Sequence, residues 1–218
     1  MNKNGFIFDL DGVIVDTAKY HFLAWKKLAE SLGTSFSEEQ NEQLKGVSRV
    51  RSLEKILEWG NVQLSETEFH ELMDQKNTNY LTYIESMTQA EILPDVQRLL
   101  SYLKLNGQPI ALGSASKNAR TILKKVSLFE QFDAIVDGND VSKAKPDPEV
   151  FLVAAKRLSR KPENCVVFED AVAGVQAANS AGMISIGIGR PEVLHEATHV
   201  FSNFTEISSE FLNNLLHH

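Results

Sequence analysis

Short apolar runs alternate with stretches of helical spacing from about residue 94 onward. The apolar runs cover residues 109–113, 132–136, 165–168 and 183–188, and a further run lies at 5–9. Apolar residues at helical spacing occur between them, near residues 96–106, 119–126, 151–158 and 171–181. Nearly continuous apolar strands separated by helices are typical of a parallel sheet that helices cover on both faces. The sequence therefore predicts a doubly wound, Rossmann-like α/β core.

Residues 16–93 lack this alternation and read as a helical insert, because their apolar residues recur at helical spacing. Two segments, Ser37–Gln40 and Ser65–Glu68, fit the capping box that opens many helices. We expect a small α-helical cap domain of residues 16–93. It would be inserted into a discontinuous α/β core domain made of residues 1–15 and 94–218.

The composition narrows the range of partners and compartments. The chain has 218 residues and a formal net charge of −7, which disfavours nucleic acid and anionic membranes as partners. Its single cysteine, Cys165, excludes an internal disulfide and a cysteine-rich zinc site. No window approaches the roughly 18 consecutive apolar residues of a membrane helix, and the acidic N-terminal stretch does not fit a signal peptide. We therefore expect a cytoplasmic protein.

Polar and charged residues lie directly after several of the predicted strands. They are Asp9 and Asp11, then Ser114 to Asn118, then Glu169 and Asp170, while Lys145-Pro146 precedes a predicted helix. In a doubly wound sheet, ligands bind outside the carboxyl ends of the strands. We expect four acids, two hydroxyls and a lysine to meet there in one crevice.

This set of side chains has a chemical interpretation. Carboxylates at close range raise one another's pKa, and a divalent cation would relieve their repulsion. A donor set of oxygens alone favours Mg²⁺. Ser114, the N–H groups that begin at Ala115, and Lys145 would bind an anion beside the metal. The combination indicates metal-assisted phosphoryl transfer. Since the chain has no P-loop, a carboxylate can be the nucleophile and form an aspartyl phosphate.

Each signal has a simpler interpretation when it occurs in isolation. An isolated Asp-x-Asp-Gly is usually a turn, Ser116 or Asn118 can simply cap a helix, and the pair Glu169-Asp170 suits the start of a helix. Cys165 reads as a buried core residue rather than a reactive thiolate. The occurrence of all these signals together, in this order, makes coincidence improbable.

The sequence resembles the haloacid-dehalogenase-like (HAD) superfamily over essentially its whole length. Phe8-Asp9-Leu10-Asp11-Gly12-Val13 is similar to the signature of that superfamily, and Ser114, Lys145 and Glu169-Asp170 match its other motifs in order. The insert resembles that of the β-phosphoglucomutase family at Asp16-Thr17-Ala18, His21, Leu44-Lys45-Gly46-Val47-Ser48-Arg49, Ser52 and Lys76-Asn77. The core motifs are specific to the superfamily only, whereas the Lys45–Arg49 segment separates a mutase from its phosphatase relatives.

The resemblance implies roles for individual residues. Asp9 would be the nucleophile and Asp11 the general acid and base. Mg²⁺ would be held by Asp9, Asp11 (through its backbone carbonyl) and Asp170, with Glu169 beside them. The transferring phosphoryl group would be held by Ser114, Ala115 and Lys145. The residues implied in substrate binding are Thr17, His21, Gly46, Val47, Ser48, Arg49, Ser52, Lys76, Ser116, Lys117 and Asn118, with Arg49 on the non-transferring phosphate.

By this resemblance, we expect a Mg²⁺-dependent isomerase that interconverts β-D-glucose 1-phosphate and glucose 6-phosphate. The reaction would pass through a phosphorylated Asp9 and a glucose 1,6-bisphosphate intermediate. We expect a monomer whose partners are small sugar phosphates. A sugar-phosphate phosphatase with the same core is the main alternative. A non-catalytic phosphosugar sensor is a further one, although such a protein would usually lose Asp9 or Asp11.

Two positions depart from the family's usual pattern. Val15 stands where a polar residue is expected, and Val50-Arg51 replaces what is more often an acidic pair after Arg49. The second departure changes the charge near the non-transferring phosphate and leaves the exact sugar phosphate open.

Overall fold

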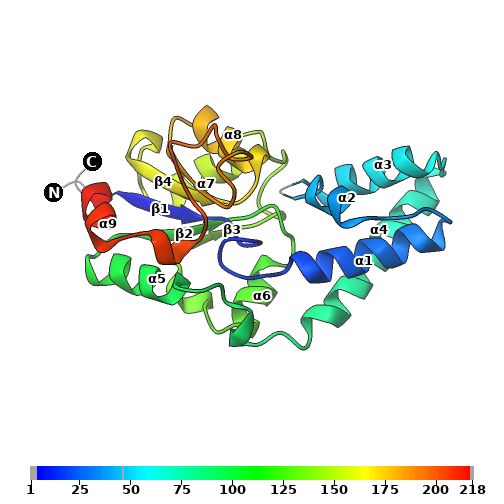
Figure 1. Cartoon of the computed structure of the whole chain (residues 1–218), viewed down its shortest axis with the longest axis horizontal. Coiled ribbons are helices and arrows are strands. Elements are labelled where there is room, and N and C mark those ends of the chain that lie inside the picture. Colours follow the sequence, from blue (N-terminus) through cyan, green and yellow to red (C-terminus); the bar gives the residue numbers. More distant parts are fainter. Residues whose placement is uncertain (1–3, 46, 217–218) are drawn as a thin grey trace.

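The computed structural model describes residues 4–45 and 47–216 and contains a parallel sheet flanked by helices (Figure 1). The strands are β1 (Gly5–Phe8), β2 (Ile110–Gly113), β3 (Ala134–Val136), β4 (Cys165–Glu169), β5 (Ile184–Ile188) and β6 (His199–Phe201). Their order is β3-β2-β1-β4-β5-β6, and all neighbouring strands are parallel. This is the strand order of a doubly wound sheet, so the predicted fold class is confirmed.

Helices occupy both the insert and the connections of the sheet. Those between β1 and β2 are α1 (Ala18–Ser31), α2 (Glu38–Glu42), α3 (Arg49–Gly60), α4 (Glu66–Ile84) and α5 (Val96–Leu105). Those further along are α6 (Ala119–Lys125), α7 (Glu149–Arg157), α8 (Val172–Ser180) and α9 (Ser209–Leu216). Short 3₁₀ turns lie at Gln89–Glu91, Phe129–Gln131, Pro162–Asn164 and Phe204–Glu206. In the part of the chain that the structure describes, no helix has the length and apolar character that a bilayer span requires.

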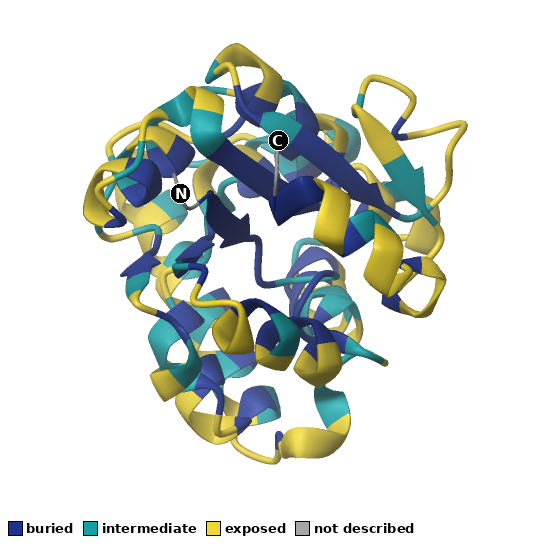
Figure 2. Ribbon diagram, turned by 90° about the vertical axis from the view of Figure 1, so that its left-hand side faces the viewer, coloured by how far each residue is buried: buried dark blue, intermediate teal, exposed yellow. Residues whose placement is uncertain are grey.

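Alternate residues of the central strands face opposite layers of helices. Phe6 and Phe8 belong to one apolar cluster, together with residues of α5, α6 and α9, whereas Ile7 belongs to another, together with residues of α7 and α8. This follows from the two-residue period of a strand. Since both faces are covered, β1, β2 and β4 are buried along their whole length, as the dark blue strands of Figure 2 show. The strands therefore read as continuous apolar runs in the sequence.

The elements β6 and α9 are not among those that the sequence predicts. β6 is a strand of only three residues at the edge of the sheet, and none of its residues is fully buried. The rings of His199 and Phe201 each lie 5.0 Å from the ring of Phe211 in α9, measured between centroids. A short, half-exposed edge strand has no apolar run, so the pattern that identifies the other strands does not extend to it.

The helical insert has an apolar cluster of its own. Its buried members are Trp25, Leu28, Ala29, Phe36, Leu44, Leu53 and Ile56. Both predicted capping boxes are confirmed, with Ser37 at the start of α2 and Ser65 at the start of α4. We call residues 16–93 the cap and the remaining residues the core. Their division into two domains at these boundaries stays a proposal.

The two segments that join the cap to the core are hydrogen-bonded to each other. The Asp16 N–H donates to the Glu91 carbonyl (2.9 Å), and the Leu93 N–H donates to the Ile14 carbonyl (3.0 Å). Val15 lies between them, fully buried, and forms a β-bridge with Ile92. This burial explains why an apolar residue occupies the position where a polar one is expected.

We predict that Phe168→Ala strongly destabilises the fold. The ring of Phe168 is fully buried and stacks on Phe8, with 4.6 Å between centroids. Removing a buried phenyl ring costs roughly 3–5 kcal/mol of unfolding free energy. Urea denaturation measures the loss, and Leu105→Ala, at a side chain that is 88% exposed, should change stability by less than about 0.5 kcal/mol. Equal losses in the two variants would contradict this packing.

Candidate active site

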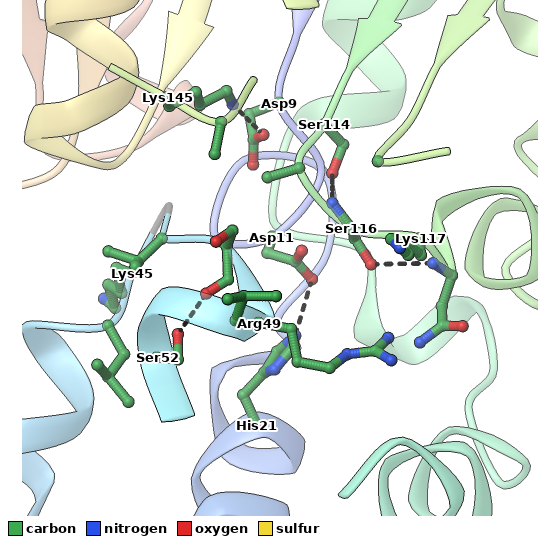
Figure 3. Close-up of a pocket in the computed structure, with 18 of the residues that line it drawn as sticks. Asp9, Asp11, His21, Lys45, Arg49, Ser52, Ser114, Ser116, Lys117 and Lys145 are labelled. Atoms are coloured by element: carbon green, nitrogen blue, oxygen red, sulfur yellow. Dashed lines mark hydrogen bonds and ion pairs between the residues drawn. The ribbon is translucent and has the colours of Figure 1, made fainter. Parts of the chain in front are cut away.

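A pocket of about 430 Å³ lies between the carboxyl ends of the strands and the cap helices (Figure 3). Its walls combine residues that follow β1, β2 and β4 with residues of α1, α3 and α4. In the strand order of this sheet, the chain reverses direction of winding between β1 and β4. The pocket therefore lies where doubly wound sheets bind their ligands.

Most residues that the sequence singles out line this one pocket. They are Asp9, Asp11, His21, Val47, Ser48, Arg49, Ser52, Lys76, Ser114, Ala115, Ser116, Lys117, Asn118, Lys145 and Asp170. Thr17 and Glu169 are fully buried behind its wall rather than in it. Gly46 lies outside the described residues. The structure thus brings the predicted side chains together, while their roles stay predictions.

Lys145 and two carboxylates form a buried charged cluster at the carboxyl ends of β1 and β4. The Lys145 ammonium donates to Asp9 Oδ1 (2.6 Å) and to Glu169, whose other oxygen accepts the Ala171 N–H (2.9 Å). The side chain of Lys145 is 1% exposed. Burial alone would lower the pKa of Lys145, but the charges of Asp9 and Glu169 outweigh it and raise that pKa. Lys145 is therefore held as a cation beside the predicted nucleophile.

Asp11 lies two residues further along, under the cap. The Thr17 hydroxyl donates to Asp11 Oδ1, and His21 Nε2 lies 3.9 Å from the same oxygen. Burial and then the charge of Asp9 raise the pKa of Asp11 to about 7. A carboxyl group whose pKa lies near the operating pH can both accept and donate a proton. Thr17 thus contacts the predicted acid and base, although it does not line the pocket.

Lys76 of α4 is held in an aromatic box rather than in solvent. It is 2% exposed, its Nζ lies 3.1 Å from His21 Nδ1, and it sits 4.5 Å and 4.7 Å from the ring centroids of Trp25 and Tyr80. Burial and then the charge of Arg49 lower the pKa of Lys76 to about 7. Lys76 is therefore not a solvated lysine on the surface of its helix.

The far side of the pocket gathers hydrogen-bond donors from both cap and core. In the loop after β2, the N–H of Ser116 donates to Ser114 Oγ (3.1 Å), and the N–H of Asn118 donates to Ser116 Oγ (3.3 Å). Arg49, the first residue of α3, points its guanidinium toward the side that carries Ser116 and Lys117, as Figure 3 shows. Asp9 and Lys145 lie on the opposite side in that view. Cationic and amide groups therefore lie at two separate places in the pocket, beside Asp9 and beside Arg49.

Some residues that line the pocket were not predicted from the sequence as site residues. The pocket is lined by the cations Lys45, Arg49, Lys76, Lys117, Lys143 and Lys145, against the acids Asp9, Asp11 and Asp170. Of the cations, Lys45 and Lys143 were not assigned a role. Lys45 lies 3.9 Å from Asp170, and Lys143, which is 68% exposed, pairs with Asp147. The lining therefore carries cations from both the cap and the core.

The carboxylates at this edge fit a magnesium ion by their chemistry. A Cβ on Gly12 would overlap Asp170 Oδ2, so glycine is what allows the Asp170 carboxylate to reach the loop after β1. Burial and then the charges of Glu169 and Asp9 raise the pKa of Asp170 well above its usual value, a crowding that a divalent cation would relieve.

The oxygen ligands that the protein offers to Mg²⁺ do not make a complete coordination shell. Within residues 4–45 and 47–216, no three acidic, histidine or cysteine side chains are grouped as a ready metal site. The expected set of two carboxylates and one carbonyl leaves positions that waters and a phosphate oxygen fill around an octahedral Mg²⁺. The predicted role of Glu169 beside the metal stays a prediction, and both of its oxygens already have partners.

Comparison with known proteins places this chain in a family. Residues 3–182 match the haloacid dehalogenase-like hydrolases, and the chain belongs to this family. It is similar to β-phosphoglucomutase of Bacillus subtilis, with 44% identity over 95% of this chain and 92% of that protein. The phosphorylated carbohydrates phosphatase of Thermotoga maritima is 31% identical over 81% of each chain. The crystal structure of β-phosphoglucomutase from Clostridium difficile matches with a TM-score of 0.94 and 42% identity, over 99% of this chain and 98% of that one.

We predict that Gly174→Ala in α8 destabilises the protein, although alanine normally stabilises a helix by roughly 0.5–1 kcal/mol relative to glycine. A Cβ on Gly174 would overlap Glu169 Oε1, the oxygen that accepts from Lys145. Disturbing a buried ion pair costs roughly 3 kcal/mol. Thermal unfolding tests this, with Ser180→Ala, an exposed position in the same helix, as the control. A melting temperature at or above that of the wild type would contradict the contact.

Proposed function

We propose that this protein is a β-phosphoglucomutase, an isomerase that interconverts β-D-glucose 1-phosphate and glucose 6-phosphate. The observation that carries the proposal is that cationic and amide groups lie at two separate places in one pocket. Ser114 and Lys145 lie beside Asp9, whereas Arg49 reaches in from the cap toward Asn118. A phosphatase needs a place for one phosphate, but a mutase has to hold the second phosphate while the first is exchanged. The similarity to β-phosphoglucomutases over nearly the whole chain supports the same activity.

In the proposed reaction, the phosphoryl group passes between Asp9 and the sugar. A free hydroxyl of the sugar monophosphate attacks the phosphorus on Asp9, the bond from phosphorus to Asp9 breaks, and Asp11 accepts the hydroxyl proton. The bisphosphate then turns over in the pocket. Asp9 attacks the other phosphorus, the bond to the sugar oxygen breaks, and Asp11 returns the proton to that oxygen. A bisphosphate or a similar donor has to phosphorylate Asp9 initially.

The neighbouring groups would bind and orient the reacting atoms. Ser114, the N–H of Ala115, and Lys145 would offset the negative charge that spreads over the transferring phosphoryl group. Asp9, Asp170 and the carbonyl of Asp11 would hold Mg²⁺, which when bound acts as a Lewis acid on the phosphoryl oxygens. The residues proposed to place Asp11 or to face the sugar are Thr17, His21, Gly46, Val47, Ser48, Ser52 and Lys76.

The cap would exclude water from the phosphorylated Asp9. Water is the competing acceptor, and its entry would turn each transfer into hydrolysis. Because the donors at the far side come from both the cap and the core, a bound phosphate would join the two parts. The binding of the substrate and the exclusion of water would then be the same event. The monomeric state and the cytoplasmic location stay predictions.

Asp9→Asn should abolish both phosphoenzyme formation and turnover, because an amide is a poor nucleophile of the same shape. Incubation with a radiolabelled phosphoryl donor and counting of the precipitated protein measure the adduct. Asp16→Asn is the control, since Asp16 is exposed and lies on the same segment. A labelled adduct in the Asp9→Asn protein would assign the nucleophile to another residue.

Arg49→Ala should lower kcat/KM for β-glucose 1-phosphate by about tenfold or more. Hydrogen bonds to charged groups contribute roughly 1.5–3 kcal/mol, and about 1.4 kcal/mol corresponds to one decade. Water should also compete better once the far phosphate is held less firmly, so the ratio of phosphate released to isomer formed should rise. A coupled assay for glucose 6-phosphate, run beside a phosphate assay, measures both quantities.

Arg51→Ala is the matched control, because Arg51 lies two residues away on α3 and is paired with Glu54 and Glu58 at the surface. Its kinetics should stay close to those of the wild type. Arg49→Lys should restore only part of the activity, since a lysine lacks the planar fork of arginine. If Arg49→Ala leaves both the rate and the ratio unchanged, the phosphatase alternative gains the support that the mutase loses.

A further inference from the structure

Beside the pocket, the amide oxygen of Asn77 is one of the polar atoms that link the cap to the core. Asn77 Oδ1 accepts a hydrogen bond from Arg49 Nη2 (2.7 Å) and another from Asn118 Nδ2 (3.0 Å). Asn77 belongs to α4 and Arg49 to α3, both in the cap, whereas Asn118 precedes α6 of the core. An amide oxygen has two lone pairs, so both of its acceptor positions are in use.

The two donors are those that the proposed function assigns to the non-transferring phosphate. One donor comes from the cap and one from the core, and an oxygen that lies between them within hydrogen-bond distance of both has the surroundings of a bound phosphate oxygen. The guanidinium of Arg49 is bonded to the neutral Asn77 amide, and the charge of Asp74 acts on it without forming an ion pair. The guanidinium of Arg49 therefore has a neutral amide, that of Asn77, as its hydrogen-bond partner.

We propose that Asn77 is a positioning residue whose amide oxygen takes the place of a phosphate oxygen in the ligand-free protein. It holds Arg49 and Asn118 together until the non-transferring phosphate of the sugar displaces it. This inference rests on the proposed function for the identity of the ligand, although the link between cap and core does not depend on it. Hydrogen bonds to a charged acceptor are stronger than those to a neutral one, so a phosphate displaces the amide while a neutral sugar hydroxyl does not.

The first test adds a charge to the oxygen without changing its shape. Asn77→Asp would pair directly with Arg49, and the phosphate would then have to displace a carboxylate. We expect KM for β-glucose 1-phosphate to rise by about tenfold or more, with kcat within about threefold of the wild type, because the displaced side chain no longer holds Arg49 once substrate is bound.

Asn79→Asp is the matched control for this charge. Asn79 lies two residues beyond Asn77 on the same helix, and its amide oxygen accepts a hydrogen bond from Lys27 on α1. The variant places the same charge on the same helix without a contact to Arg49. Its KM should stay within about twofold of the wild type by the usual weakness of surface charge pairs. Equal KM values for the two aspartate variants would overturn the proposal.

The second test needs no activity. Spin labels on cysteines introduced at Glu71 of the cap and Lys156 of the core, both exposed, report the distance between the two parts in the ligand-free chain. Burial raises the pKa of Cys165 to about 11, so the native thiol reacts slowly with the label and the introduced thiols react first.

We expect Asn77→Leu, which keeps the size but removes the acceptor, to shift the ligand-free distances to longer values. Asn77→Asp should give a narrower distribution of distances, centred on the shorter values. Unchanged distances in Asn77→Leu would overturn the proposed link even in an active mutase. If the wild type forms no glucose 6-phosphate, yet Asn77→Leu lengthens the distances, the mutase proposal fails while the link between cap and core is supported.

Discussion

A buried cluster of charges at the ends of β1 and β4 is the constraint on which the rest of the site depends. Lys145, Asp9 and Glu169 would each be costly to bury alone, and they are tolerated because each neutralises another. The parallel register pairs Phe8 with Phe168, so the residues after each strand emerge side by side. Small residues complete the arrangement, since Gly174 and Gly12 leave room for Glu169 and Asp170. The cluster thus forms the floor of the pocket that the strand order places between β1 and β4.

The fold was predictable from the sequence where burial is complete. Strands covered on both faces have to be apolar throughout, so the runs ending at Phe8, Gly113 and Phe168 identified β1, β2 and β4 directly. That argument does not extend to β6, whose residues are only partly covered and include His199. Helix α9 packs over this edge through Phe211. The short edge strand therefore has no pattern that marks it, whereas α9 does carry apolar residues at helical spacing, Leu212, Leu215 and Leu216, and could have been predicted from them.

The site was predictable in part for a related reason. Side chains directly after a parallel strand share one edge of the sheet, so Asp9, Ser114 and Asp170 could be grouped without knowing any contact. A residue whose role depends on its partner could not be placed in this way. Lys76 could read as a solvated lysine until the rings around it were known, and Asn77 carries no charge to mark it.

The hydrogen-bonded pairing of the two crossing segments has a mechanical consequence. Two independent connecting segments would allow the cap to slide, twist and tilt relative to the core. Because the two segments are hydrogen-bonded to each other at Asp16–Glu91 and Ile14–Leu93, the movement that they leave is mainly a rotation about one axis. Val15 also bridges Asp11, so the loop that carries this carboxyl group is tied to the same axis. A rotation of the cap would therefore also move the backbone that carries Asp11. The position of Asp11 relative to Asp9 would then depend on the angle of the cap.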